Sequence, residues 1–230
     1  MKVAIHQPNF LPWLGYFYKI ANSEIFIFLD DTQYTKNSFI NRNRIKTPQN
    51  EKWLTIPVKG SGKFGQLIKD VEIDAFAKNV RKIKNTIKTN YSKSKYFNEV
   101  YSLVEPALTT YMLSEVNEML IINICNYLKI ETKFIKSSDL NFQQYNSTER
   151  LIQLCKDVNA TSYLSGFGGI NYQDSVMFKH NNIKLITSDF IHPTYPQLWG
   201  WFIPNLSIID LLFNCGSKSK EIILNAKVQN

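Results

Sequence analysis

Apolar runs alternate along the chain with stretches of helical periodicity. Residues 3–5 and 24–29 are almost wholly apolar, as in short strands that are buried on both faces. Between them, large apolar residues recur at intervals of three or four from Trp13 to Ile20, which predicts a helix that begins near Pro12. The first thirty residues therefore predict a β-α-β unit with a right-handed crossover.

The rest of the chain continues this alternation. Further strands are predicted at residues 53–58, 67–73, 133–136, 160–165 and 184–186. Helical spacing covers most of 75–128 and recurs in 147–158, 174–180 and 205–216. Helices that alternate with short strands predict an α/β fold with a mostly parallel, Rossmann-like sheet. Since no sharp change of composition divides the chain, we expect one domain over 1–230, with the mostly helical region 75–128 as an insertion or subdomain.

Polar residues follow the first two predicted strands. His6 and Gln7 end the first strand, and Asp30 and Asp31 end the second. In open α/β sheets, strand ends and helix N-termini converge on ligand sites. His6 can bind phosphate as a cation or act as a general acid or base, and Gln7 can donate to a phosphate or carbonyl oxygen. One aspartate can hold Mg²⁺ or a ribose or accept a proton; otherwise Asp30 caps a turn and Asp31 is solvated.

A donor-rich segment follows the second strand. It includes Gln33 and the run Asn41-Arg42-Asn43-Arg44. Arginine pairs phosphate or carboxylate through two N–H groups at once, so this run suits an anion site. A solvated basic loop fits the same composition.

Three more candidates lie in glycine- or proline-rich loops. Lys59 opens the basic stretch 59–65, which can close over phosphates but lacks the spacing of a P-loop. Ser165 and Gly166 end a predicted strand, where backbone N–H groups can cradle phosphate, although a plain turn fits as well. His192 is a second candidate acid or base.

Charge and cysteine content add little to this picture. A formal net charge of +8 suits a nucleotide, a nucleotide-sugar or RNA, but it equally suits a lysine-rich proteome. RNA binding needs a continuous basic face, and the lysines are dispersed along the sequence. Cys125, Cys155 and Cys215 are far apart and flanked by apolar residues, which predicts buried free thiols. Without a membrane-spanning apolar run or a signal-peptide centre, we expect a cytoplasmic protein.

Several of these motifs together resemble one known family. They are His6-Gln7-Pro8, Pro12-Trp13-Leu14-Gly15-Tyr16-Phe17, Leu29-Asp30-Asp31 with Gln33, Asn41-Arg42-Asn43-Arg44-Ile45, Trp53-Leu54-Thr55-Ile56-Pro57-Val58, Tyr163-Leu164-Ser165-Gly166 and Leu206-Ser207-Ile208-Ile209-Asp210-Leu211-Leu212-Phe213-Asn214-Cys215-Gly216. By these runs the chain resembles the WbqC-like family over nearly its whole length, apart from the middle helical region. The resemblance implies a place in bacterial surface-polysaccharide gene clusters, in which some members have been suggested to transfer glycine onto amino sugars.

A more distant likeness concerns the order of elements. A strand, a Gln-Pro loop, a Leu-Gly helix start and a second strand are similar to HUP-class nucleotidylyltransferases, which would make the sheet HUP-type. That class stabilises the transferred phosphate with an HxGH motif. The corresponding stretch here is Pro12-Trp13-Leu14-Gly15-Tyr16, which lacks both histidines, so His6 would have to compensate from the strand end.

The resemblance implies a transferase of O-antigen or capsule biosynthesis that glycylates the amino group of a nucleotide-linked sugar. The donor would be an activated amino acid: an adenylate made with ATP and Mg²⁺, or an aminoacyl-tRNA. His6 or Asp31 would accept the proton, and His6, the aspartates and the Asn-Arg run would meet in one pocket. The substrate- and phosphate-binding set would be Gln7, Asp30, Gln33, Asn41, Arg42, Asn43, Arg44, Lys59, Ser165, Gly166 and His192. The alternative is a non-catalytic nucleotide- or glycan-binding protein.

Overall fold

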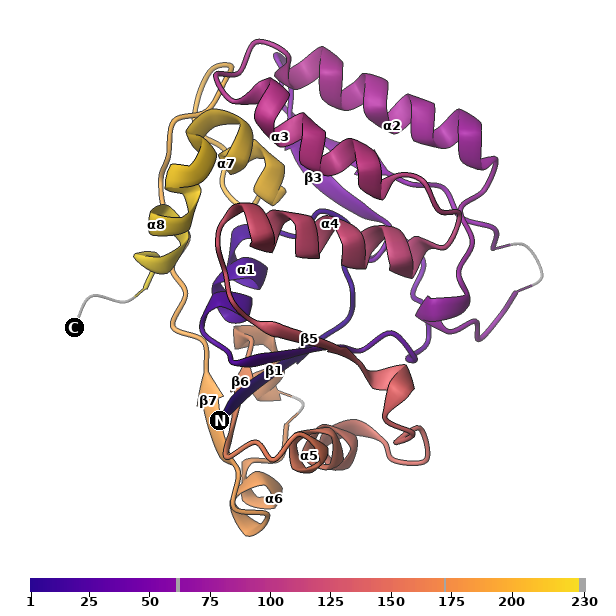
Figure 1. Cartoon of the computed structure of the whole chain (residues 1–230), viewed down its shortest axis with the longest axis vertical. Helices are drawn as coiled ribbons and strands as arrows, with labels where there is room; N and C mark the ends of the chain where they lie inside the picture. Colours follow the sequence, from indigo (N-terminus) through magenta and orange to yellow (C-terminus); the bar gives the residue numbers. More distant parts are fainter. Residues whose placement is uncertain (61–62, 172, 228–230) are drawn as a thin grey trace.

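The centre of the molecule is a five-stranded sheet in which every neighbouring pair of strands is parallel (Figure 1). The structure is a computed structural model that describes residues 1–60, 63–171 and 173–227. In the order in which they lie across the sheet, the strands are β5 (Lys133–Lys136), β2 (Ile25–Phe28), β1 (Lys2–His6), β6 (Ser162–Ser165) and β7 (Lys184–Thr187). The predicted α/β fold with a parallel, Rossmann-like sheet is confirmed.

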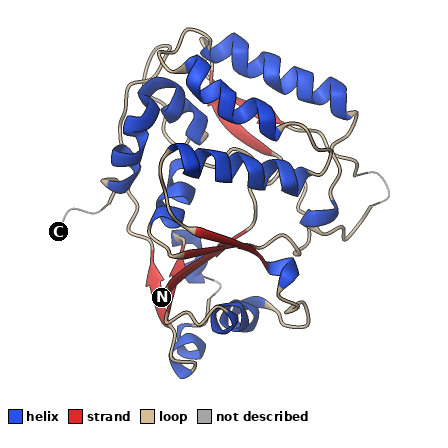
Figure 2. Ribbon diagram, in the orientation of Figure 1, coloured by secondary structure: helices blue, strands red, loops and turns tan. Residues whose placement is uncertain are grey.

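Alternate residues of each strand point to opposite faces of the sheet and enter two different cores. Val3 and Ile5 pack on the face that α5 (Ser147–Asp157) and α6 (Ser175–His180) cover. Phe26 and Phe28 enter the larger core on the other face, together with apolar residues of α1 (Leu14–Ala21), α4 (Leu113–Tyr127) and α7 (Ile208–Cys215). Figure 2 shows helices on both sides of the sheet, as a three-layer α/β fold requires.

An outer layer extends the larger core beyond α4. It consists of α2 (Phe76–Tyr91), α3 (Phe97–Val104) and the antiparallel hairpin β3 (Arg42–Lys46) with β4 (Glu51–Thr55). α3 packs on α4, and α2 packs on β4. The short helix α8 (Ser219–Leu224) packs on α1, and 3-10 turns lie at η1 (Ile68–Asp70), η2 (Glu105–Ala107), η3 (Ser137–Asp139), η4 (Phe167–Asn171) and η5 (Gly216–Lys218).

Two segments differ from the prediction. Residues 67–73 form the 3-10 turn η1 between isolated bridges instead of a strand, because Ile68 and Val71 both turn into the core. β3 was not predicted, since its inward-facing residues include Asn43 and hide the alternation of a half-buried strand.

The three cysteines are free and buried, as expected. Within the described residues, no helix combines the length and the apolar character needed to cross a bilayer.

Candidate functional site

The strand order creates a switch point at the centre of the sheet. The chain runs from β1 to β2 and β5 on one side, and continues with β6 and β7 on the other, so the loops after β1 and β6 diverge. Ligands of open parallel sheets bind outside the carboxyl ends of such a strand pair. A cavity of about 320 Å³ lies there. Its lining includes the side chains of His6, Trp13, Lys19, Ser165, Phe167 and Gln173 and the glycines Gly15, Gly166, Gly168 and Gly169.

His6 reaches this cavity from the last position of β1. Its Nδ1 lies 3.0 Å from the carbonyl oxygen of Gln7, so this nitrogen carries the proton and donates it. Burial, and next the charge of Lys19, lower the pKa of His6 to about 3. The ring is therefore neutral at pH 7, and no described residue donates to Nε2. His6 fits a proton acceptor better than the phosphate-binding cation that the sequence also allowed.

Lys19 is a site residue that the sequence reasoning missed. It lies on α1, its side chain lines the cavity, and only 3% of the residue is exposed. Its Nζ donates to the carbonyl oxygen of Ile5 at 3.0 Å, and no described carboxylate pairs with it. Burial lowers the pKa of Lys19 to about 7. A buried ammonium without a counter-ion favours an anionic ligand, because the anion would offset the cost of its desolvation.

Trp13 forms an aromatic wall of the cavity. A Cβ added to Gly15 would lie 2.4 Å from the Trp13 ring, so glycine is needed for the indole to lie against the start of α1. The indole also meets Phe190 in a T-shaped contact, with ring centroids 5.2 Å apart. Across the cavity, Phe167 is 79% exposed. Aromatic faces of this kind suit a planar base or the apolar face of a sugar.

The turn after β6 supplies the opposite wall. Ser165 is buried, and its hydroxyl donates to the carbonyl oxygen of Gly166 at 3.0 Å. A Cβ on Gly169 would lie 2.2 Å from Ser165 Oγ and 2.7 Å from Gln173 Nε2, so the turn packs closely only with glycine there. Gln173 Oε1 is buried and has no hydrogen-bond partner among the described residues. The turn thus presents an unused acceptor beside the cavity.

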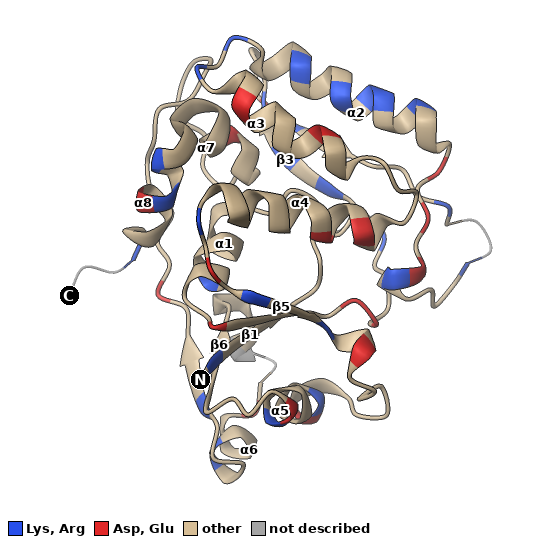
Figure 3. Ribbon diagram, viewed as in Figure 1, with Lys and Arg blue, Asp and Glu red and all other residues tan. Residues whose placement is uncertain are grey.

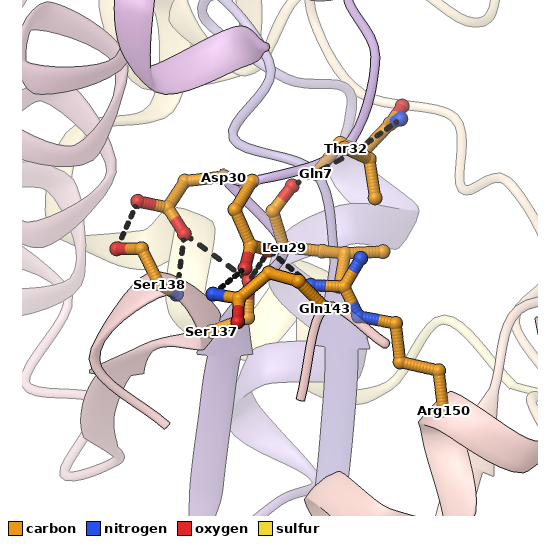
Figure 4. Close-up of polar contacts among 9 residues, drawn as sticks. Gln7, Leu29, Asp30, Thr32, Ser137, Ser138, Gln143 and Arg150 are labelled. Carbon is orange, nitrogen blue, oxygen red and sulfur yellow. Dashed lines mark hydrogen bonds and ion pairs between the residues drawn. The ribbon is translucent and has the colours of Figure 1, made fainter. Parts of the chain in front are cut away.

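Asp30 and Asp31 form a closed network instead of lining this cavity (Figure 4). Asp30 accepts hydrogen bonds from the Ser138 hydroxyl at 2.7 Å and the Ser138 N–H at 3.0 Å. Asp31 accepts from Gln143 at 2.9 Å, from Ser137, and from Arg150 of α5 at 2.5 Å. Every carboxylate oxygen of the pair therefore has a protein donor, so the network holds β2, β5 and α5 together.

Gln7 connects the two regions. Its Nε2 donates to the Thr32 hydroxyl at 3.1 Å, one residue beyond Asp31, while its carbonyl oxygen accepts from His6 Nδ1. Gln7 is thus held by Thr32, the residue after Asp31, and its carbonyl oxygen also accepts from the Tyr16 hydroxyl at 3.0 Å.

The Asn-Arg run lies in the hairpin β3–β4 and ties loops together. Arg42 stacks over Trp53 at 4.3 Å, and Arg44 pairs with Glu51 at 2.7 Å. Asn43 Nδ2 donates to the carbonyl oxygen of Leu11 at 2.6 Å. The same oxygen accepts from the Ser207 hydroxyl at 2.7 Å, and Leu11 itself adopts a left-handed φ of 42°. Asn41 donates to the Ile56 carbonyl oxygen at 3.0 Å, at the open end of the hairpin, so Asn43 is the amide of this run that braces the loop after β1.

The remaining candidates lie apart from the switch point. Lys59 pairs with Glu72 at 2.6 Å, in a stretch whose residues 61 and 62 lie outside the described residues. Gln33 is exposed and forms an isolated bridge with Leu67. His192 Nε2 accepts from the Asn205 N–H at 3.0 Å, and its Nδ1 lies 2.9 Å from the Pro193 carbonyl oxygen, so both nitrogens are engaged. The structure brings His6, Ser165 and Gly166 together; it does not bring the aspartates and the Asn-Arg run into their cavity.

The fold and the site define a Rossmann-like α/β protein with a ligand cavity at the switch point of its sheet. The sequence matches the model of the WbqC-like protein family over residues 7–222, and the chain belongs to this family. It is also 40% identical over 228 residues to the uncharacterized protein Rv1507c of Mycobacterium tuberculosis (strain ATCC 25618 / H37Rv), covering 96% of this chain and 97% of that protein. Family membership suggests a role in polysaccharide biosynthesis.

Proposed function

We propose that the chain is a cytoplasmic transferase of surface-polysaccharide biosynthesis that acylates, specifically glycylates, the amino group of a nucleotide-linked sugar. The observation that carries this proposal is the switch-point cavity, in which an unpaired lysine, a neutral histidine and two aromatic side chains meet. In this assignment, the nucleotide-linked sugar binds at the cavity and the activated amino acid approaches its amine.

Lys19 and the aromatic walls support a nucleotide-linked ligand. A phosphate beside Lys19 Nζ would pair the buried cation, and a charge-assisted hydrogen bond of this kind contributes about 1.5–3 kcal/mol. Trp13 and Phe167 offer faces to a ring at the rim. Neither feature needs Arg42, Arg44 or Lys59, which already have protein partners.

His6 supports acyl transfer to an amine. The amine nitrogen attacks the donor's carbonyl carbon, a C–N bond forms, and the bond from that carbon to the leaving oxygen breaks. The nitrogen loses one proton, which His6 Nε2 accepts and then passes to the leaving oxygen. The hydrogen bond from Nδ1 to the Gln7 carbonyl oxygen fixes the tautomer that this role needs. Asp31 contributes by positioning, since Arg150, Ser137 and Gln143 occupy its oxygens.

One observation favours the alternative of a non-catalytic binder. A pKa of about 3 makes His6 a weak base, because burial and Lys19 both disfavour the imidazolium. A ligand phosphate would offset the charge of Lys19 and raise the pKa of His6. A transferase needs the bound ligand to raise the pKa of His6 far enough for proton transfer, whereas a binding protein does not.

The test is a search for acylated product. The purified protein is incubated with a panel of nucleotide-linked amino sugars and, in separate arms, with glycine and ATP or with glycyl-tRNA, and the products are analysed by mass spectrometry. We expect a sugar nucleotide that is heavier by one glycyl group, and its loss in His6→Asn. The matched control is His180→Asn, which replaces an exposed histidine at the end of α6. No product from any donor, together with tight binding of a nucleotide-sugar, would favour the binder.

A further inference from the structure

A second cavity, of about 400 Å³, lies far from the chemistry discussed so far, between α2 and β4. The polar residues that line it include Lys52, Lys78, Arg81, Lys82, Asn85 and Thr89. Lys52 comes from β4, and the others lie on α2, where spacings of three, four, seven and eleven residues from Lys78 place them on one face of the helix. Figure 3 shows cationic residues repeated along α2, and Lys78, Arg81 and Lys82 are exposed. The fold thus brings Lys52 beside the cations of α2.

The charge of this groove is one-sided. Helix α2 carries five cations and no acidic residue, while α4, of similar length, carries two acidic residues and no cation. Lys84 pairs with Glu105 at 3.2 Å, and Lys88 lies over the Tyr101 ring, so these two already have partners. No described carboxylate lies within ion-pair distance of Lys52, Lys78, Arg81 or Lys82. A polyanion would relieve their mutual repulsion.

We propose that this groove binds the phosphate backbone of an RNA. Three of the cations lie within five residues of α2, and the groove from Lys78 to Thr89 is about 17 Å long at 1.5 Å per residue. Closely spaced phosphates match such a dense row, while hydroxyl and amide side chains such as Thr89 and Asn85 add donors for phosphate or ribose oxygens.

The groove fits a membrane surface less well. Membrane-binding helices insert large apolar side chains beside their cations. The exposed residues of α2 include none: apart from Ala77 they are polar or charged, and Val80, Ile83 and Ile87 are buried beneath them. An acidic glycan, with more widely spaced charges, leaves part of the row unpaired.

The role of this RNA rests on the proposed function, which requires an activated amino acid. Among the possible donors, aminoacyl-tRNA is the one that carries a phosphate backbone. The groove therefore points to aminoacyl-tRNA as the donor, held by α2 while its acylated end supplies the glycyl group.

The experiment measures binding of fluorescently labelled tRNA by anisotropy at several salt concentrations. One variant combines Lys52→Gln, Lys78→Gln, Arg81→Gln and Lys82→Gln. The control combines Lys129→Gln, Lys156→Gln, Lys179→Gln and Lys184→Gln, which removes the same charge from exposed positions elsewhere. At about 0.1 M salt we expect the groove variant to bind at least 30-fold more weakly and its salt dependence to fall by about three counterions. The control should lose less than threefold, and a Lys→Arg version of the groove should keep affinity.

Several outcomes would overturn this assignment. They are an equal loss in both variants, no binding of tRNA at 50 mM salt, or equal binding of polyglutamate, an acidic polysaccharide or phosphatidylglycerol vesicles. A thermal melt shows whether each variant is folded. Glycyl transfer from glycine and ATP without tRNA binding would overturn the RNA groove and leave the proposed function standing. Binding of tRNA by the groove without any acyl transfer would support the groove and count against the proposed function.

Discussion

Two polar regions lie at the same edge of the sheet and differ in how completely their groups are paired. At the ends of β2 and β5, Asp30 and Asp31 have a donor for every carboxylate oxygen. At the ends of β1 and β6, the Lys19 ammonium has a single carbonyl acceptor, and no described residue hydrogen-bonds His6 Nε2. Lys19 and His6 line the switch-point cavity, and Asp30 and Asp31 do not.

This difference distinguishes polar groups that stabilise the fold from polar groups that are available to a ligand. A buried network in which every carboxylate oxygen has a donor stabilises one arrangement of the chain, and removing a member costs stability. Buried groups left without protein partners destabilise the fold on their own, and they are retained where a ligand supplies the missing contact. The two regions should therefore respond in opposite ways to mutation.

The largest effect is expected from Arg150→Met in the paired region. The substitution leaves Asp31 as a buried carboxylate without its counter-charge, which costs about 3–5 kcal/mol of unfolding free energy. Chemical denaturation measures this loss. Lys156→Met, at an exposed position of the same helix, should change stability by less than about 0.5 kcal/mol. Equal stability of the two variants would show that the network is not structural.

His6→Asn should have the next largest effect, and on activity alone. Loss of the proton acceptor should lower kcat by about 10²- to 10³-fold with little change in KM. Steady-state kinetics of glycyl transfer measure both constants, with His180→Asn as the control. An unchanged kcat would remove His6 from the mechanism.

Lys19→Met should weaken the binding of a nucleoside diphosphate by roughly 10- to 100-fold, as the loss of one charge-assisted contact predicts. Isothermal titration calorimetry measures the affinity, again beside Lys156→Met. In contrast to Arg150→Met, this variant should be at least as stable as the wild type, since it removes a buried charge without a counter-ion. A destabilised Lys19→Met would place Lys19 among the structural groups.

The pH dependence of stability also distinguishes Lys19 from the paired groups. Burial lowers the pKa of Lys19 from 10.5 to about 7, so between these values the unfolded chain holds a proton that the folded chain has released. The free energy of unfolding therefore rises with pH across that window, by up to about 1.4 kcal/mol per pH unit from Lys19. Denaturation at pH 7, 8 and 9 should show a slope that is smaller in Lys19→Met. Parallel curves for the two proteins would contradict the shift.

The sequence predicted the fold better than the site. Apolar runs such as 24–29 define parallel strands, and the strand–loop–helix at the start locates one wall of the cavity. The partner of Asp31, however, is 119 residues away, and no local pattern shows that Arg150 will reach it. Lys19 was missed because a single lysine in a short helix is usually solvated. Lys19 follows Gly15 by four residues and so lies on the same face of α1, and this spacing could have placed Lys19 at the cavity.

The carbonyl oxygen of Leu11 accepts hydrogen bonds from residues that the ribosome adds at very different times. It accepts from Asn43 and from Ser207, which follows it by 196 residues, and the N–H of Ile208 donates to Pro12 at 2.8 Å. A nascent chain therefore cannot complete the contacts of the loop after β1 until Ser207 and Ile208 have left the ribosome. Loss of the chain from Ser207 onward would remove two of these donors and so loosen the loop that leads into Trp13, although neither α7 nor α8 lines the cavity.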